Sequence, residues 1–354
     1  MVSPVHDVTR ADLSRHTTLR LGGPATRLAT VTHQDELIDI IRQTGGDFFL
    51  LAGGSNVVIS DSGVDTTVVL IRSTGIELDP DGDDVLLTVQ AGQPWDDLVN
   101  LCVTEGLSGI ECLSGIPGSA GATPIQNVGA YGQEVAETIS SVRVLDRADD
   151  VVRELAPAEC GFAYRTSRFR AQDRFVVLSV TFRLRRDPLS APLRYGELAR
   201  ALDSDPGARV PLAEVRAAVL ALRAGKGMVL DPADPDTNSV GSFFTNPVLS
   251  QADHAALVAR ADEVARTQPP SWPAEDGGVK VSAAWLIERA GFAKGYHGGH
   301  LGVAISGKHT LALTNRGTGT TGSLLSLARE IRDGVAKIFD VELHPEPVLV
   351  GCAL

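Results

Sequence analysis

The stretch Gly115-Ile-Pro-Gly-Ser-Ala-Gly-Ala-Thr-Pro-Ile-Gln-Asn-Val-Gly-Ala-Tyr-Gly-Gln-Glu134 decides how this chain is interpreted. It is rich in glycine and other small residues, contains two prolines, and has almost no large side chain before Tyr131. Glycine permits positive φ and close approach of the backbone, so successive N–H groups can turn toward one anion. The stretch therefore predicts a loop that lies against a ligand carrying phosphate groups.

A second stretch of the same kind, Ala52-Gly-Gly-Ser-Asn-Val-Val58, follows the apolar run Phe48–Leu51. Neither stretch has the Gly-Lys-Ser/Thr of a Walker loop or the Gly-x-Gly-x-x-Gly pattern of a Rossmann fold. One such segment alone would be explained equally well by an ordinary turn. Two in one chain favour a cofactor that carries phosphates.

Together the two stretches resemble the flavin-binding domain of the vanillyl-alcohol-oxidase (PCMH) type, in the version of the UDP-N-acetylenolpyruvoylglucosamine reductase family. The resemblance begins near His16-Thr-Thr-Leu-Arg-Leu-Gly-Gly23 and runs to the last residues. Three further segments match that family in the same order: Gly161-Phe-Ala-Tyr-Arg-Thr-Ser167, Val240-Gly-Ser-Phe-Phe-Thr-Asn-Pro247 and Leu343-His-Pro-Glu-Pro-Val348.

The resemblance implies FAD as the cofactor and NADPH as a co-substrate. Neither loop contains a histidine or cysteine that could tether a flavin, so we expect FAD to be bound non-covalently. The residues that match the family's FAD-binding positions are Gly53, Gly54, Ser55, Asn56, Gly115, Ile116, Pro117, Gly118, Ser119, Gly121, Ala122, Gln126, Asn127, Gly129, Ala130 and Tyr131.

The same resemblance assigns catalysis to Arg165, Ser242 and Glu346. Arg165 would meet the carboxylate of an enolpyruvyl group, which suits a guanidinium fork. Ser242 would protonate the substrate carbon as a general acid, and Glu346 would stabilise the intermediate or return the proton to Ser242. Taken alone, these residues would be a solvated arginine, a serine in a turn and a surface glutamate. A hydrolase nucleophile is disfavoured, because the sequence around Ser242 lacks the Gly-x-Ser-x-Gly elbow.

For substrate binding, the matching positions are Tyr164, Tyr195, Lys226, Asn246 and His309. Two of them depart from the family pattern. Lys226 lies in Gly225-Lys-Gly-Met-Val-Leu-Asp-Pro232, which is spaced differently from the shorter Lys-Leu-Pro-Asp-Pro version. His309 stands where other members carry an amide.

The expected elements follow the order β-α-β-β-α rather than a long regular alternation, which predicts the α+β class. The first helix is expected behind Thr32, with Asp35 as its capping-box partner. Helices are expected at 34–44, 94–105, 212–222, 251–267, 282–290 and 323–339, and strands at 48–51, 67–71, 85–89, 141–145, 175–184, 302–305 and 310–314.

The resemblance implies an FAD-binding domain of two subdomains, residues 1–80 and 81–229. A C-terminal α+β substrate-binding domain would follow at 230–340, with the terminal strand 341–354 as a candidate to return to the first subdomain. A break in composition at Asp231-Pro-Ala-Asp-Pro-Asp236 agrees with a boundary near residue 230.

Composition excludes several other classes of function. The formal net charge of −12 disfavours nucleic acid or an anionic membrane as partner. Met1–Arg20 has no apolar core typical of a signal peptide, and no apolar run is long enough to span a bilayer. Four cysteines without a Cys-x-x-Cys pair, and His297-Gly-Gly-His300 without a third ligand, predict reduced thiols and no metal. We expect a cytoplasmic monomer that is not inserted in a membrane.

The implied reaction reduces the enolpyruvyl group of UDP-N-acetyl-3-O-(1-carboxyvinyl)-glucosamine to UDP-N-acetylmuramate, a step of peptidoglycan synthesis in cell-wall biogenesis. Hydride would come from flavin N5 and the proton from Ser242. Two alternatives remain at this point: a flavin-dependent sugar or alcohol oxidase with the same cofactor fold, and a catalytically inactive UDP-sugar-binding protein. The presence of Arg165, Ser242 and Glu346 favours the reductase.

Overall fold

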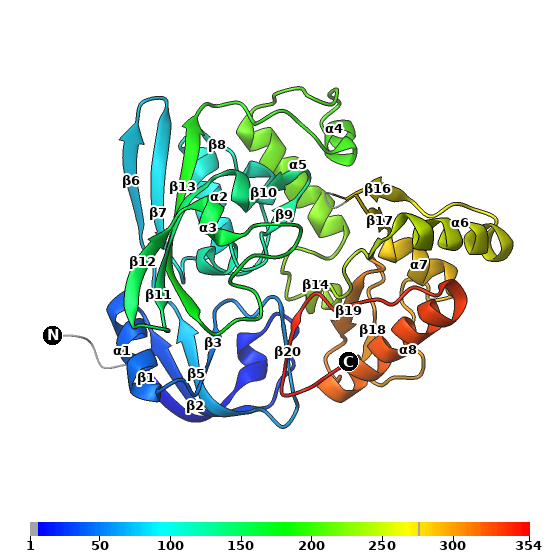
Figure 1. The fold of residues 1–354 in the computed structure, drawn as a ribbon, viewed down its shortest axis with the longest axis horizontal. Coiled ribbons are helices and arrows are strands. Elements are labelled where there is room, and N and C mark those ends of the chain that lie inside the picture. Colours follow the sequence, from blue (N-terminus) through cyan, green and yellow to red (C-terminus); the bar gives the residue numbers. More distant parts are fainter. Residues whose placement is uncertain (1–5, 275–276) are drawn as a thin grey trace. The chain divides into compact units, whose positions relative to one another are not determined.

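The computed structural model describes residues 6–274 and 277–354 and divides into two compact units (Figure 1). The first unit comprises residues up to Ala11, Thr26–Gly53 and Thr66–Gly225. The second comprises Asp12–Ala25, Gly54–Asp65 and Lys226–Leu354. Both units contain helices and mainly antiparallel sheets, so the predicted α+β class is confirmed. The division at 1–80, 81–229 and 230–340 stays a prediction.

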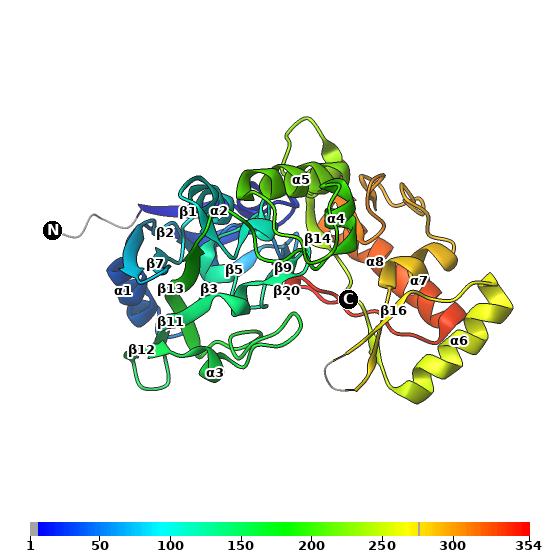
Figure 2. The same ribbon diagram turned by 90° about the horizontal axis from the view of Figure 1, so that it is seen from above.

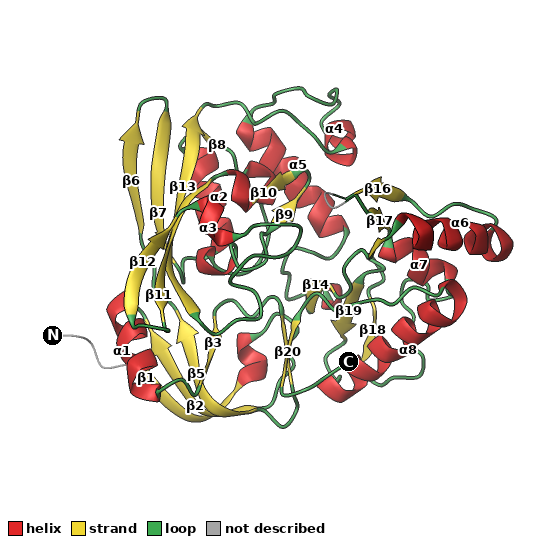
Figure 3. Ribbon diagram, in the orientation of Figure 1, coloured by secondary structure: helices red, strands yellow, loops and turns green. Residues whose placement is uncertain are grey.

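The main sheet of the first unit has the order β12–β11–β13–β7–β6, with β8 also paired to β13 (Figure 3). Its core includes Trp95 and Phe182, whose ring centroids lie 5.7 Å apart. The strands are β6 (Ile76–Asp81), β7 (Asp84–Gln90), β8 (Leu107–Ser108), β11 (Ile139–Asp146), β12 (Val151–Leu155) and β13 (Phe175–Arg186).

Helices α2 to α5 and a short strand pair also belong to the described part of this unit. Helix α2 begins behind Pro94 and ends before Gly106, which has φ +68°, as the sequence predicts. The elements are α2 (Trp95–Thr104), α3 (Pro157–Cys160), α4 (Gly196–Ala201), α5 (Leu212–Gly225), β9 (Gly129–Ala130) and β10 (Gln133–Glu134).

A second sheet has the order β1–β2–β5–β3, formed by β1 (His6–Asp12), β2 (Pro24–Val31), β5 (Val64–Ile71) and β3 (Phe48–Leu51). Helix α1 (Gln34–Thr44) packs its apolar face on residues of this sheet. Its capping partner is Glu36, whose carboxylate accepts from the N–H groups of Thr32 at 2.8 Å and His33 at 3.2 Å. Asp35 was therefore the wrong partner, because the N-cap is His33 and the third helical residue is Glu36.

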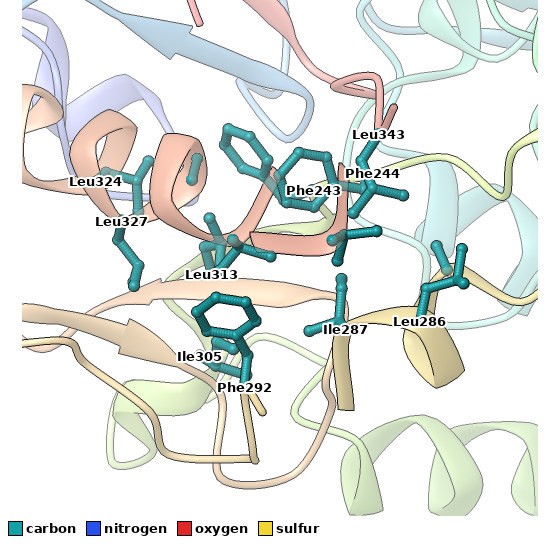
Figure 4. Close-up of a cluster of buried hydrophobic side chains, with 14 of the residues drawn as sticks. Phe243, Phe244, Leu286, Ile287, Phe292, Ile305, Leu313, Leu324, Leu327 and Leu343 are labelled. Carbon is teal, nitrogen blue, oxygen red and sulfur yellow. The ribbon is translucent and has the colours of Figure 1, made fainter. Parts of the chain in front are cut away.

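In the described part of the second unit, α6, α7 and α8 pack around small sheets (Figure 2). Its core joins Phe243 and Phe244 to Ile287, Ile305 and other apolar residues of α7, α8 and the strands (Figure 4). The elements are β4 (Val57–Ile59), β14 (Ser239–Ser242), β15 (Val248–Leu249), α6 (Gln251–Ala265), β16 (Ser271–Pro273), β17 (Val279–Val281), α7 (Ala283–Arg289), β18 (Val303–Ile305), β19 (Ala312–Asn315), α8 (Thr321–Phe339) and β20 (Val348–Val350). None of the helices in the described ranges has the length and apolar character needed to cross a bilayer.

Candidate active site

The two glycine-rich stretches meet in the first unit, where their backbones lie too close for any side chain. A Cβ added to Gly53 would lie 2.5 Å from the Cα of Gly118. A Cβ on Gly121 would lie 2.5 Å from the Cβ of Ala91, the residue after β7. Such distances exclude alanine without displacement of the backbone. We call Gly53, Gly118 and Gly121 the glycine cradle.

Backbone hydrogen bonds fix the shape of the longer loop. The N–H of Trp95 donates to Gly118 O at 3.1 Å, and the N–H of Gly121 donates to Ala91 O at 2.9 Å. Gly115 and Gly118 have φ of 72° and 119°, values that an L side chain rarely adopts. The loop is therefore held in its conformation by strand and helix ends.

Ser119 supplies the observation that tests the fit of FAD to this loop. Its hydroxyl is buried, and among the residues that the structure describes it has no hydrogen-bond partner. A buried hydroxyl without a partner is unfavourable, and a phosphate oxygen would satisfy it. The donor type and the close-packed glycines beside it both fit a diphosphate-bearing cofactor.

The second half of the loop reaches Asn127 and Tyr131, both with positive φ (44° and 50°). Asn127 is buried, and its amide donates to Glu134 at 2.7 Å and accepts from the Ala136 N–H at 3.2 Å. These bonds hold the turn around β9 and β10. A direct contact of Asn127 with FAD stays a prediction.

Arg165 lies at the tip of a four-residue turn. Ala163 and Thr166 exchange both backbone hydrogen bonds, at 3.1 and 3.2 Å, and Arg165 between them has φ 52°. Its guanidinium donates to Gly129 O at 2.7 Å and to Asn127 O at 3.3 Å. The carbonyl of Arg165 accepts from Arg170 at 2.7 Å. Arg165 is thus attached to the glycine-rich loop by its side chain.

Two of the remaining predicted residues, Tyr164 and Tyr195, lie near this turn and loop. The Arg165 guanidinium lies over the Tyr164 ring, 5.4 Å from its centroid. Tyr195 meets Tyr131 edge to face, with ring centroids 5.5 Å apart. Tyr195 is 44% exposed and therefore keeps a surface that a ligand can cover.

In the second unit, the segments that carry Ser242 and Glu346 run antiparallel to each other. The N–H of Glu346 donates to Phe243 O at 2.8 Å, and Phe244 forms a bridge with Pro345. Both Ser242 and Glu346 are partly exposed. Two of the three predicted catalytic residues are therefore brought close in the backbone, although about a hundred residues separate them in sequence.

Other predicted positions also lie in the second unit. Gly54 packs against the segment at His16, because a Cβ on it would lie 2.0 Å from His16 O. The Asn246 side chain accepts from the Ala283 N–H at 3.0 Å, at the start of α7. The N–H of His309 donates to the Ser306 hydroxyl at 3.2 Å. Lys226 is partly exposed and begins the last segment of this unit.

Ser55 and Asn56 lead into β4, and Asn56 O accepts from the Val348 N–H of β20 at 2.9 Å. The remaining cofactor positions, Ile116, Pro117, Ala122, Gln126 and Ala130, belong to the longer loop of the first unit. How Arg165 in that unit is placed relative to Ser242 and Glu346 stays a prediction.

Sequence reasoning missed two side chains that form hydrogen bonds to the backbone of the two glycine-rich stretches. Asp96 accepts from the Gly115 N–H at 2.6 Å and from Arg216 at 2.7 and 2.8 Å. Arg72 donates to Ala52 O at 2.9 Å, directly before Gly53. Asp96 lies in the first turn of a predicted helix and Arg72 follows a predicted strand, which were the available signals.

The ionisation of these groups follows from their surroundings. Burial raises the pKa of Asp96, but the Arg216 and Gly115 hydrogen bonds outweigh it, so that the net pKa lies below its ordinary value. Burial raises the pKa of the Cys102 thiol to about 12, and that of Cys160 to about 11. These two thiols stay protonated at neutral pH and are unsuited to nucleophilic chemistry.

The histidine pair that raised the question of a metal has other contacts. His300 Nε2 lies 2.9 Å from a carboxylate oxygen of Glu330, and the ring of His297 accepts from the Gly299 N–H at 3.2 Å. Within the described ranges, no group of three histidine, cysteine, aspartate or glutamate residues is arranged to hold a metal ion.

Comparison with known proteins bears directly on this arrangement. Residues 25–156 match the family described as the FAD binding domain, and residues 232–350 match the UDP-N-acetylenolpyruvoylglucosamine reductase C-terminal domain. The UDP-N-acetylenolpyruvoylglucosamine reductase of Salinispora arenicola is 61% identical over 357 residues, covering 99% of this chain and 98% of the relative. That of Thermobifida fusca is 56% identical over 348 residues, covering 97% of each.

A solved structure agrees with the sequence relatives. The crystal structure of UDP-N-acetylenolpyruvylglucosamine reductase from Thermus caldophilus covers 98% of this chain and 99% of its own, with a TM-score of 0.67 and 25% identity. The expected fold, an FAD-binding domain followed by a C-terminal α+β domain, is thereby confirmed. The chain belongs to the UDP-N-acetylenolpyruvoylglucosamine reductase family.

Proposed function

We propose that this protein uses FAD and NADPH to reduce the enolpyruvyl group of UDP-N-acetyl-3-O-(1-carboxyvinyl)-glucosamine, forming UDP-N-acetylmuramate for peptidoglycan synthesis. The observation that carries the proposal is the full-length similarity to reductases of this name, at 61% and 56% identity. The glycine cradle and the buried Ser119 hydroxyl support it from the side of the cofactor.

Gly53, Gly118, Ser119 and Gly121 would hold the diphosphate of FAD. When bound, FAD supplies hydride transfer, taking hydride from NADPH and delivering it to the enolpyruvyl double bond. The protein supplies position, charge and a proton. We take the FAD to be non-covalent, since the two loops offer no histidine or cysteine as a tether.

Arg165 would bind the substrate carboxylate. Its guanidinium is oriented by the carbonyls of Asn127 and Gly129, so little rearrangement is needed when the carboxylate arrives. Negative charge that develops next to the carboxylate during reduction would be stabilised by the same guanidinium. Tyr164, Tyr195, Lys226, Asn246 and His309 would bind the rest of the UDP-sugar.

Ser242 would donate the proton that the substrate carbon acquires. A serine hydroxyl is a weak acid, so the alkoxide must be stabilised or reprotonated by a neighbour. Glu346 is the candidate for this duty, because its N–H is bonded to the carbonyl of Phe243, the residue after Ser242. A monomeric state, a cytoplasmic location and the absence of nucleic-acid partners stay predictions from the sequence.

Anaerobic spectroscopy tests the function directly. We expect the purified protein to be yellow, to lose its visible flavin band on addition of NADPH, and to regain it when the enolpyruvyl UDP-sugar is added. UDP-N-acetylmuramate should appear in equal amount to the flavin reoxidised. Reduction of the flavin by a sugar or alcohol, with reoxidation only by oxygen, would support the oxidase instead. Protein that binds the UDP-sugar but no flavin would support the inactive binding protein.

A further inference from the structure

Arg72 occupies a position beside the glycine cradle that the proposed roles leave unexplained. It directly follows β5, and its N–H donates to Val31 O at 2.8 Å. Its Nη1 donates to Ala52 O at 2.9 Å and to Ile71 O at 2.8 Å. Because β3 and β5 are parallel neighbours, with Leu51 paired to Leu70, Ala52 and Arg72 leave the same end of the sheet.

The end of β7 also lies at this place. A Cβ on Gly92 would lie 2.5 Å from Ser73 N, and the Gly92 N–H donates to the Ser73 hydroxyl at 3.3 Å. Ala91, the preceding residue, accepts from the Gly121 N–H of the cradle. Arg72 is thus connected to the cradle in two ways: its side chain bonds the residue before Gly53, and the next residue, Ser73, contacts the β7 end that bonds Gly121.

The charge of Arg72 has no compensating group among the residues that the structure describes. Arg174, Arg183 and Arg216 each bond an aspartate, whereas both recorded acceptors of Arg72 are carbonyl oxygens. Burial lowers the pKa of Arg72, and no neighbouring charge contributes to that shift. A half-buried cation without a counter-ion is unfavourable unless a ligand supplies the negative charge.

The N–H donors of Arg72 that are not used on Ala52 and Ile71 fit a diphosphate. A guanidinium carries five N–H donors, and Nη1 uses its two on Ala52 and Ile71. The donors on Nε and Nη2 have no recorded acceptor within the described ranges. Planar N–H groups of this kind bind phosphate oxygens with charge-assisted hydrogen bonds.

We propose that Arg72 is an FAD-binding residue that supplies the positive charge for the cofactor's diphosphate. The proposal rests on the proposed function in so far as it takes FAD to be the ligand of the glycine cradle. It adds a charged side chain to a site otherwise made of glycines and a serine. The competing explanation is that Arg72 only fastens the carbonyl of Ala52 in place.

Two substitutions distinguish a contribution of the Arg72 charge to FAD binding from a role limited to holding the Ala52 carbonyl in place. Arg72→Lys keeps the charge, and Arg72→Gln keeps an N–H donor but loses the charge. On the full-length protein as purified, we would follow FAD release after dilution by the recovery of flavin fluorescence, and then titrate back FAD or riboflavin, which has no phosphate. Arg72→Gln should weaken FAD binding by roughly tenfold or more, because a charge-assisted contact is lost, and Arg72→Lys by less. Riboflavin binding should be the same in all three proteins.

Salt and a matched arginine provide controls. The affinity of the unsubstituted protein for FAD should fall more steeply with salt than that of Arg72→Gln. Arg147 lies over the ring of Phe48, at the other end of β3, is also partly buried, and donates to the carbonyl of Asp173. Arg147→Gln should leave FAD release unchanged.

The outcomes are distinct. Equal weakening of FAD and riboflavin binding by both Arg72 substitutions, with an equal fall in thermal stability, would mean fastening alone and overturn the proposal. Retention of unsubstituted FAD affinity in Arg72→Gln would also overturn it. If the unsubstituted protein binds no FAD, the proposed function itself fails, and this result is recognised before any variant is made.

Discussion

At the scale of single residues, several predicted site residues have backbone conformations that residues other than glycine rarely adopt. Arg165, Asn127 and Tyr131 have φ between 44° and 52° without being glycine. Such residues are unfavourable unless their surroundings hold them. Arg165 is held by its turn, by the Arg170 guanidinium on its carbonyl, and by its own bond to Gly129 O. Its direction is therefore a property of the folded loop.

Gly129→Ala tests that dependence. The added Cβ would lie 2.8 Å from the Glu134 Cγ and 3.0 Å from the Arg165 Nη1, so the Glu134 side chain must shift and the guanidinium must give way slightly. We expect reoxidation of the reduced flavin by substrate to slow on the order of 10²-fold, because a small displacement of a positioned group has effects of that size. Gly225→Ala in α5, where a Cβ meets nothing within 4 Å, is the control. If Gly129→Ala slows an Arg165→Met protein by the same factor, its effect does not pass through Arg165.

Ser242→Ala separates the two half-reactions. If Ser242 only delivers a proton to the substrate carbon, flavin reduction by NADPH should remain nearly intact. Reoxidation by the enolpyruvyl substrate should slow roughly 10²–10⁴-fold, and Ser242→Cys should recover part of that loss. Anaerobic stopped-flow absorbance of the flavin measures both halves. Equal slowing of both would show that Ser242 shapes the site rather than donating the proton.

At the scale of elements, the sequence predicted most helices and central strands, because their apolar periodicity is local. It missed the edge strands β6 (Ile76–Asp81), which is largely exposed, and β12 (Val151–Leu155), of which only Leu155 is buried; both carry charged residues. An edge strand has a neighbour on one side only, so its pattern is weak. The pairing of the Ser242 and Glu346 segments depends on contacts distant in sequence, which periodicity cannot show.

An ion pair between the end of β11 and the residue before β13 predicts how the stability of the protein responds to acid. Arg174 donates to both carboxylate oxygens of Asp146 at 2.8 Å, and these bonds are the main reason why the Asp146 pKa is lowered to about 2. A lowered folded-state pKa stabilises the protein above the unfolded value near 4, and this contribution is lost as the pH falls toward 2.

Asp146→Asn should therefore lower the free energy of unfolding at neutral pH, and the difference from the unsubstituted protein should shrink between about pH 4 and pH 2. Urea unfolding followed by circular dichroism at several pH values measures it. Arg174→Met should show the same pH dependence, since it removes the other partner. A difference that stays constant across this range would contradict the assignment to Asp146.

At the scale of the whole molecule, each unit draws on segments that are far apart in the chain. The second unit combines Asp12–Ala25 and Gly54–Asp65 with Lys226–Leu354, so the Gly53–Gly54 pair lies at a boundary between units. Composition predicted a break near residue 230 but contained no signal for these two short segments. Their assignment depends on contacts such as the Thr18 N–H to Gly54 O at 3.1 Å, which join positions remote in sequence.

The last prediction concerns motion between the units. Arg165 belongs to the first unit and Ser242 and Glu346 to the second, so a substrate that uses all three residues must favour one arrangement of the units. Spin labels on Gln43→Cys in α1 and Asp262→Cys in α6, both exposed positions, would report the distance between units. The partly exposed Cys352 would be replaced in the same protein to limit background labelling. We expect the distance distribution to narrow and shift when the enolpyruvyl UDP-sugar is added to the oxidised protein. UDP-N-acetylglucosamine, which lacks the carboxylate that Arg165 would bind, should produce a smaller change. An identical distribution with and without the substrate would contradict this prediction.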